Sequence, residues 1–189
     1  YTVAGTVAMI NIGDVISNGF RITIKPAVGL RGVILDAQAT NLNYATWLNN
    51  ANAKRFSVRG LKFINMPNNG NGFILQGALA NTYEGNILEL CEIEHRSAGD
   101  AFNLGSGTLA DPFIVRNNAV YTPAAVSPAQ RGANFPEIAT GICGLKLLGN
   151  TFRRLVKGVT ADNPTSLQGI VCVDNIFDDI QTEFFNHLA

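Results

Sequence analysis

Short runs of alternating apolar and polar residues recur along this chain of 189 residues, and turn-forming residues separate them. The run Phe56–Phe63 is typical: apolar and variable positions alternate up to Gly60, and the run ends on a large apolar side chain. β-Branched and aromatic residues fill such runs, and Gly, Asn, Asp and Pro break them. A helix would instead repeat its apolar residues every 3.6 positions over about ten residues or more. The pattern therefore predicts short β-strands joined by turns.

The run Phe56–Phe63 has four looser copies later in the chain, and each ends on a large apolar residue. Those end positions are 63, 93, 120, 152 and 177, so the intervals are 30, 27, 32 and 25 residues. A strand-like repeat of roughly 20–50 residues indicates a solenoid. One copy cannot bury its apolar face alone, so successive copies are expected to stack.

Stacking places equivalent side chains of neighbouring coils above one another, about 4.8 Å apart. It predicts an internal apolar ladder of the residues that end the runs: Phe63, Ile93, Val120, Phe152 and Phe177. A turn-like residue precedes each end position by three: Gly60, Leu90, Asn117, Gly149 and Asp174. Directly after it, three copies carry an asparagine: Asn118, Asn150 and Asn175. We predict that these three form an internal amide ladder that satisfies the turn backbone of neighbouring coils.

Two sets of segments carry a resemblance to a known fold family. Arg21–Pro26, Gly32–Asp36 and Val58–Phe63 resemble its opening coils, and the Asn-Asn-x-Val, Gly-Asn-x-Phe and Asp-Asn-x-Phe turns resemble its asparagine turns. The family is the right-handed parallel β-helix of the pectate-lyase-like and chondroitinase-B-like superfamily. The resemblance spans roughly residues 20–180. It implies an all-β chain folded as a single-stranded right-handed parallel β-helix solenoid of about seven coils. It does not imply one activity, because the superfamily holds lyases, hydrolases, phage tailspikes, adhesins and non-catalytic modules.

Length and turn content predict one domain over residues 1–189 with an irregular loop at about 121–140. That segment holds three of the seven prolines, so it is expected to project from the coil. Both a recognition loop and a passive insertion fit it. A chain that begins with Tyr1 suits a removed leader or an excised domain, and both suit an extracellular, cell-surface or virion protein.

The charge and hydropathy of the chain restrict its partners. The net charge is zero, which argues against nucleic acid or an anionic membrane held by bulk charge. No apolar run reaches the ~18 residues that span a bilayer. The three cysteines, Cys91, Cys143 and Cys172, show no metal-binding spacing, and Cys91 and Cys172 fall on inward positions. We expect small buried hydrophobic residues, with a disulfide or a metal site as the alternative.

Stacking also aligns charged side chains of neighbouring coils. Lys62 aligns with Glu92, and Glu94 aligns with Arg153 and then Asp178. His95 aligns in the same way with Arg154 and then Asp179. Such pairs fit a solvated ion-pair ladder, which contributes little stability. They also fit a site for a charged substrate.

The site alternative is lysis of an acidic polysaccharide, which needs a cation at the sugar carboxylate, a base and an acid. The resemblance implies Lys and Arg as acid and base, with Ca²⁺ in many members. Candidate catalytic residues are Lys62, His95 and Arg96. Candidate ligands for sugar or Ca²⁺ are Glu92, Glu94 and Asp100. They supply only part of the six to eight oxygens that Ca²⁺ typically takes. Motifs of polygalacturonases, serine hydrolases and nucleotide-binding proteins are missing.

Two hypotheses follow for the function. The first is a non-catalytic extracellular or virion module, structural or carbohydrate-binding, that needs no cofactor. It self-associates or joins a larger parent assembly, because neither end of the stack shows a cap for its strand edges. The alternative is a polysaccharide lyase that performs calcium-assisted β-elimination on a uronic-acid polymer.

Overall fold

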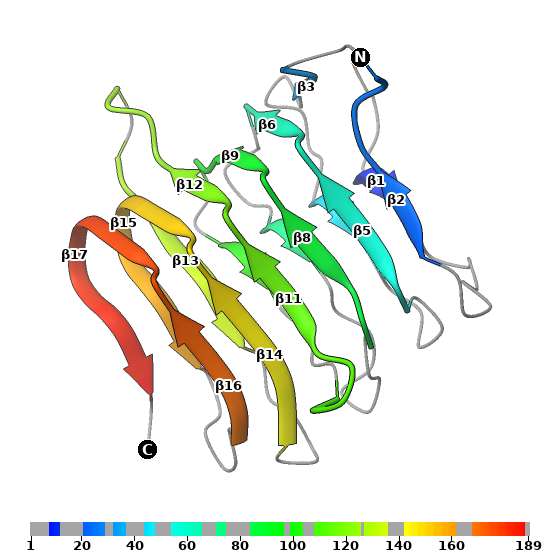
Figure 1. The fold of residues 1–189 in the computed structure, drawn as a ribbon. Coiled ribbons are helices and arrows are strands. Elements are labelled where there is room, and N and C mark those ends of the chain that lie inside the picture. Colours follow the sequence, from blue (N-terminus) through cyan, green and yellow to red (C-terminus); the bar gives the residue numbers. More distant parts are fainter. Residues whose placement is uncertain are drawn as a thin grey trace.

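The structure is a computed structural model that describes residues 8–11, 21–28, 32–36, 44–47, 54–65, 71–74, 84–96, 99–103, 108–125, 127–135, 142–161 and 168–187. These residues form strands and turns, and every strand pair is parallel. The chain is a parallel β-solenoid, which confirms the predicted all-β fold class (Figure 1). Over the same residues, no helix has the length and apolar character needed to cross a membrane.

One sheet holds six strands, each from a later part of the chain than the one before (Figure 1). Parallel pairing puts the same end of every strand at the same edge of this sheet, so the chain leaves all six strands at one corner. In spatial order the strands are β2 (Ile22–Ile24), β5 (Phe56–Arg59), β8 (Ile87–Glu89), β11 (Phe113–Arg116), β14 (Ile142–Leu148) and β16 (Gln168–Val173).

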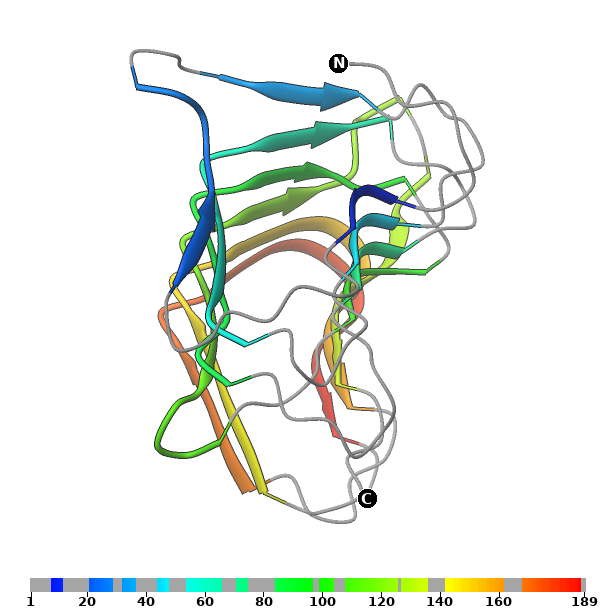
Figure 2. The ribbon, with the colours of Figure 1, turned by 90° about the vertical axis from the view of Figure 1, so that its right-hand side faces the viewer.

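The second sheet has eleven strands in two limbs that the long strand β15 (Thr151–Ala161) joins. The first part of β15 pairs with the near limb, and the later part pairs with the far limb. The near limb is β3 (Ile34–Asp36), β6 (Lys62–Ile64), β9 (Glu92–Glu94) and β12 (Ala119–Tyr121). The far limb is β1 (Ala8–Asn11), β4 (Tyr44–Trp47), β7 (Asn71–Ile74), β10 (Asp100–Asn103) and β13 (Ala129–Phe135), and β17 (Ile176–His187) pairs with β15. In Figure 2 the six-stranded sheet and the far limb lie on opposite sides of the core.

The apolar ladder runs through the core as predicted. Strand pairing places Phe63 beside Ile93, Ile93 beside Val120, Val120 beside Phe152 and Phe152 beside Phe177. The first four side chains are fully buried, and Phe177, in the last coil, is partly buried. The rings of Phe152 and Phe177 stack with centroids 5.4 Å apart. The register of the repeat is thereby confirmed.

The amide ladder is also confirmed, and it has one repeated hydrogen-bond pattern. The backbone N–H of Cys91 donates to Asn118 Oδ1 over 2.9 Å, that of Asn118 to Asn150 Oδ1 over 3.1 Å, and that of Asn150 to Asn175 Oδ1 over 3.0 Å. Each Asn Nδ2 donates to a backbone carbonyl of another coil, at Leu88, Val115 and Leu147. The Nδ2 groups of Asn118 and Asn150 also donate to the next asparagine in the ladder.

The corner before each ladder position has a left-handed backbone. Gly60, Leu90, Asn117, Gly149 and Asp174 have φ between 54° and 66°, so the turn role predicted for all five is confirmed. Glycine and asparagine tolerate this conformation better than most residues do, whereas a leucine there costs about 1–2 kcal/mol. Leu90 is half exposed in the turn, so its side chain does not offset that cost by burial.

The region at 121–140 differs from the predicted irregular loop. Ala129–Phe135 forms β13, which pairs with β10 and with β15, so these residues belong to the stack. The prolines explain the difference, because Pro123, Pro128 and Pro136 flank the strand and do not interrupt it. The right-handed turn and the count of about seven coils stay predictions.

The cysteines follow the ladder only in part. Cys91 is buried and free, as expected for a small core residue. Cys172 is also free, and it continues the inward column next to Leu147. It is nonetheless exposed, contrary to the expectation of burial, because β16 is the last strand of its sheet and nothing in the described residues covers it. The side chain of Cys143 lies outside the described residues.

Replacing Asn150 with leucine tests the amide ladder. We expect Asn150→Leu to lower the free energy of unfolding by about 2–4 kcal/mol, because the buried N–H of Asn118 and the carbonyl of Val115 in the neighbouring coil lose their partner. Urea unfolding followed by circular dichroism measures the loss. Asn175→Leu is the matched control: Asn175 is half-buried, so water replaces part of its bonding and the loss should be smaller. Equal losses in both variants would contradict a buried ladder.

Candidate functional site

The charged residues that the repeat aligns lie on the outer face of the near limb, in the predicted register. Lys62 pairs with Glu92 across β6 and β9, with Nζ and Oε1 2.5 Å apart. Tyr121 lies between Glu94 and Arg153 in the stack. Arg153 Nε lies 3.1 Å from Asp178 Oδ2 in the last coil. The predicted alignments of these charges are therefore confirmed.

The remaining charged candidates have partners of their own. Arg96 Nε donates to Glu94 Oε1 over 2.6 Å. Asp100 is buried at the start of β10, and its Oδ1 lies 2.7 Å from Arg131 Nε on β13. In the described part of the chain, no three His, Cys, Asp or Glu side chains gather so that they could hold a metal ion. The structure thus does not bring Glu92, Glu94 and Asp100 together.

His95 is fully buried behind β9, away from the outer face. Its Nε2 lies 3.1 Å from the carbonyl oxygen of Gly99, so Nε2 carries the proton and donates it. Its Nδ1 is buried and has no hydrogen-bond partner among the described residues. Burial lowers the pKa of the imidazole to about 4, although the bond to Gly99 opposes the shift. His95 is therefore neutral at neutral pH and out of reach of a surface substrate.

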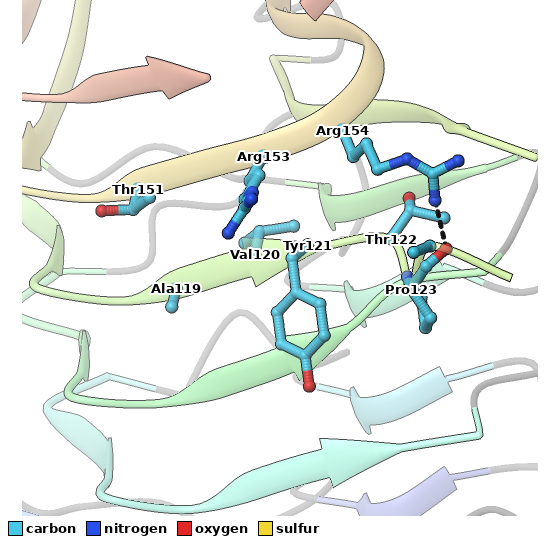
Figure 3. Close-up of a pocket in the computed structure, with 9 residues that line it drawn as sticks. Ala119, Val120, Tyr121, Thr122, Pro123, Thr151, Arg153 and Arg154 are labelled. Carbon is cyan, nitrogen blue, oxygen red and sulfur yellow. Dashed lines mark hydrogen bonds between the residues drawn. The ribbon is translucent and has the colours of Figure 1, made fainter. Parts of the chain in front are cut away.

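A groove of about 510 Å³ opens on the same outer face, over β12 and the first part of β15 (Figure 3). Arg154 closes one end, where its Nη1 donates to the carbonyl oxygen of Pro123. The ring of Tyr121 extends from β12 away from Arg153, and Lys62 Nζ lies 5.9 Å from its centroid. The lining residues are Ala119, Val120, Tyr121, Thr122, Pro123, Ala124, Thr151, Arg153 and Arg154.

Two groups beside the groove are held in their protonated forms. The hydrogen bond with Glu92 raises the pKa of Lys62, although partial desolvation opposes it. Burial raises the pKa of Tyr121, and Glu92 adds to that shift while Lys62 opposes it. At neutral pH Lys62 is an ammonium ion and Tyr121 a neutral phenol. Both can donate hydrogen bonds, and neither is a ready general base.

Sequence reasoning missed Tyr121 as a site residue because it placed this residue at the start of the predicted loop. The signal was present in the repeat. Tyr121 follows Val120 as Glu94 follows Ile93 and Arg153 follows Phe152. Its outward position beside two charged residues follows from that alignment, as strand pairing confirms.

No protein-family model, curated protein or solved structure matches this chain. The assignment of the fold as a parallel β-solenoid therefore depends on the strand pairing alone. Membership of the pectate-lyase-like superfamily stays a prediction.

Acidification tests the burial of His95. The pKa is about 4 in the folded chain against an ordinary value of 6.5, so the unfolded chain binds the proton first as the pH falls. Stability from this group is complete above pH 6.5 and declines toward pH 4, by on the order of 2–3 kcal/mol. We expect His95→Leu to flatten the pH dependence of the free energy of unfolding between these values. Identical slopes in both proteins would contradict a neutral, buried His95.

Proposed function

We propose that this chain is a non-catalytic β-helix module, extracellular or on a virion, that binds carbohydrate in the groove beside Tyr121. The observation that carries the proposal is the contrast between this groove and the predicted catalytic residues. The groove presents the Tyr121 ring, the Thr151 hydroxyl and Arg153, whose side chain is 66% exposed although it is ion-paired with Asp178. Lys62 and Arg96 are each paired with a carboxylate, and His95 is buried.

The groove suits a sugar for physical reasons. The C–H face of a sugar ring packs against an aromatic side chain, and its hydroxyl groups need hydrogen-bond partners. Tyr121 supplies the ring, Thr151 supplies a hydroxyl, and Arg153 supplies donors from a side chain that is 66% exposed. Because these residues stand on paired strands, little conformational entropy is lost when they bind.

The same geometry favours binding over β-elimination. A lyase needs an unprotonated base within reach of the substrate and an acid for the leaving oxygen. The two groups nearest the groove stay protonated at neutral pH, for the reasons given above. The alternative function, a polysaccharide lyase, is therefore kept as an outcome of the test below.

The last coil supports the second half of the proposal, assembly with copies or partners. Its strands β16 and β17 expose Val171, Val173, Ile176 and Phe184, and among the described strands each of the two is paired on one side only. Such edges pair with other chains unless something covers them. We expect sedimentation of the whole chain to show self-association that Phe184→Lys weakens. A strictly monomeric chain at high concentration would contradict this.

Removing the Tyr121 ring tests the groove. We expect Tyr121→Ala to weaken binding to the best-retained polysaccharide by about tenfold or more, since aromatic anchors dominate such contacts. Tyr121→Phe keeps the ring and should keep most of the affinity. Leu109→Ala, which removes an exposed apolar side chain that does not line the groove, is the control. Affinity electrophoresis over neutral and acidic polysaccharides measures all three.

A parallel assay separates binding from catalysis. Elimination on a uronic-acid polymer creates a double bond that absorbs in the ultraviolet. We expect no absorbance increase with alginate, pectate or chondroitin, with calcium or with a chelator. An increase that Lys62→Ala abolishes would overturn the non-catalytic proposal in favour of the lyase.

A further inference from the structure

Four cations lie on the outer face of the six-stranded sheet, as its strand pairing shows. Side chains alternate between the core and the outside along each strand. Arg59 lies beside Glu89, and Glu89 beside Arg116, in neighbouring strands. Lys25, one residue beyond the paired Ile24 and Val58, extends this row at one end. On the other side of Arg116 the paired residue is Leu148, and Lys146 lies two positions before Leu148 on the same strand. We call Lys25, Arg59, Arg116 and Lys146 the basic stripe.

Glu89 fixes the two arginines of the stripe. Its Oε2 accepts a bond of 2.8 Å from Arg116 Nε, and its Oε1 lies 3.7 Å from Arg59 Nη1. The carboxylate side chain is only 10% exposed, whereas Arg59 and Arg116 are 53% and 42% exposed. One covered carboxylate therefore holds two exposed guanidinium groups, and positive charge faces the solvent.

The charge of this face is not balanced within it. Glu89 is the one carboxylate among the outward positions of the six strands, from Lys25 to Val173, so four cations face one anion. Acidic residues at the corners do not cancel the excess, because Glu84 pairs with Lys54 and Asp111 with Arg55. Asp174 lies at the corner beyond the last strand. A chain of zero net charge thus has one positive face.

The spacing of the stripe and the residues beside it indicate which chemical class of partner fits it. Neighbouring strands are about 4.8 Å apart, comparable with one sugar unit of an extended polysaccharide. Ile87 and Ile114 form an aliphatic row two positions before Glu89 and Arg116, where the C–H faces of sugar rings can pack. The outward positions of these strands hold no aromatic side chain for stacking nucleic-acid bases.

We propose that the basic stripe binds a linear polyanionic polysaccharide, whose carboxylate or sulfate groups pair with Lys25 and Arg59 on one side of Glu89 and with Arg116 and Lys146 on the other. The stripe lies on a different sheet from the Tyr121 groove. The inference deepens the proposed carbohydrate binding by giving it a second surface and a charge class. It rests on that proposed function only in assigning the chain to glycans.

The test removes three of the four stripe cations. It keeps Arg116, so that Glu89 retains one of its two partners. The variant Lys25→Gln/Arg59→Gln/Lys146→Gln keeps Arg116 on Glu89. The control Lys157→Gln removes a cation that is ion-paired with Glu183 on the other sheet, and Lys146→Gln is the matched single-charge change in the stripe. Isothermal titration at low salt uses dextran sulfate and polygalacturonate as probes, with neutral dextran and single-stranded oligothymidylate as comparisons.

We expect the whole chain to bind dextran sulfate or polygalacturonate, and high salt to weaken the binding by screening. The stripe variant should bind about tenfold more weakly, and the control should bind like the wild type. The relative strength of the two polyanions shows whether sulfate or carboxylate is preferred. Circular dichroism checks that each variant is folded.

Three outcomes would overturn the inference. They are no binding to either polyanion, an equal loss in the stripe and control variants, or tighter binding of oligothymidylate than of both polyanions. If Tyr121→Ala abolishes polyanion binding while the stripe variant keeps it, the groove accounts for all of it. In that case the stripe fails and the proposed function stands. If the stripe variant alone loses polyanion binding, the stripe stands, and the groove is judged separately by the Tyr121→Ala test with its own polysaccharide.

Discussion

The hydrogen bonds of the asparagine ladder are the constraint on which the rest of the solenoid depends. At this corner the chain turns through a left-handed residue, and the next backbone N–H points along the stack into the core. A buried N–H without a partner costs roughly 1–3 kcal/mol. An asparagine one coil further on supplies the acceptor, and its amide group donates back to a carbonyl of an earlier coil. With its further bond to Asn150, the Asn118 side chain joins three coils, and a shift of register would break every such bond at once.

The register of the stack also determines where the side chains of the two proposed binding surfaces lie. Once Asn118 and Asn150 are stacked, Val120 must lie beside Phe152, and Tyr121 beside Arg153. The core column and the outer column follow from the same alternation along a strand. The Tyr121 groove and the basic stripe are therefore not built by separate loops. They are outward columns of one stack whose spacing the ladder sets, so strand pairing holds the backbone under both.

The repeat allowed the sequence to predict whatever depends on equivalence between coils. The five left-handed turns, the apolar column and the pairing of Lys62 with Glu92 all follow from one alignment. Features that depend on a single coil could not be predicted from the repeat. β13 forms where prolines suggested a loop, because they fall beside the strand. The burial of His95 and the pairing of Asp100 with Arg131 depend on how the chain crosses to the far limb, which the repeat does not encode.

The two outer faces show why a net charge of zero says little about partners of a solenoid. On the larger sheet the sign alternates from coil to coil: Lys62 lies beside Glu92, and Arg153 beside Asp178. The charges cancel there, and hydrogen-bonding groups and a ring remain for recognition. On the six-stranded sheet the sign repeats, and Glu89 serves two arginines. Strand alternation thus sorts the charges of one neutral chain onto faces of different character. Screening acts over about 10 Å, a length comparable with two or three coils, so a partner responds to the face it touches and not to the total charge.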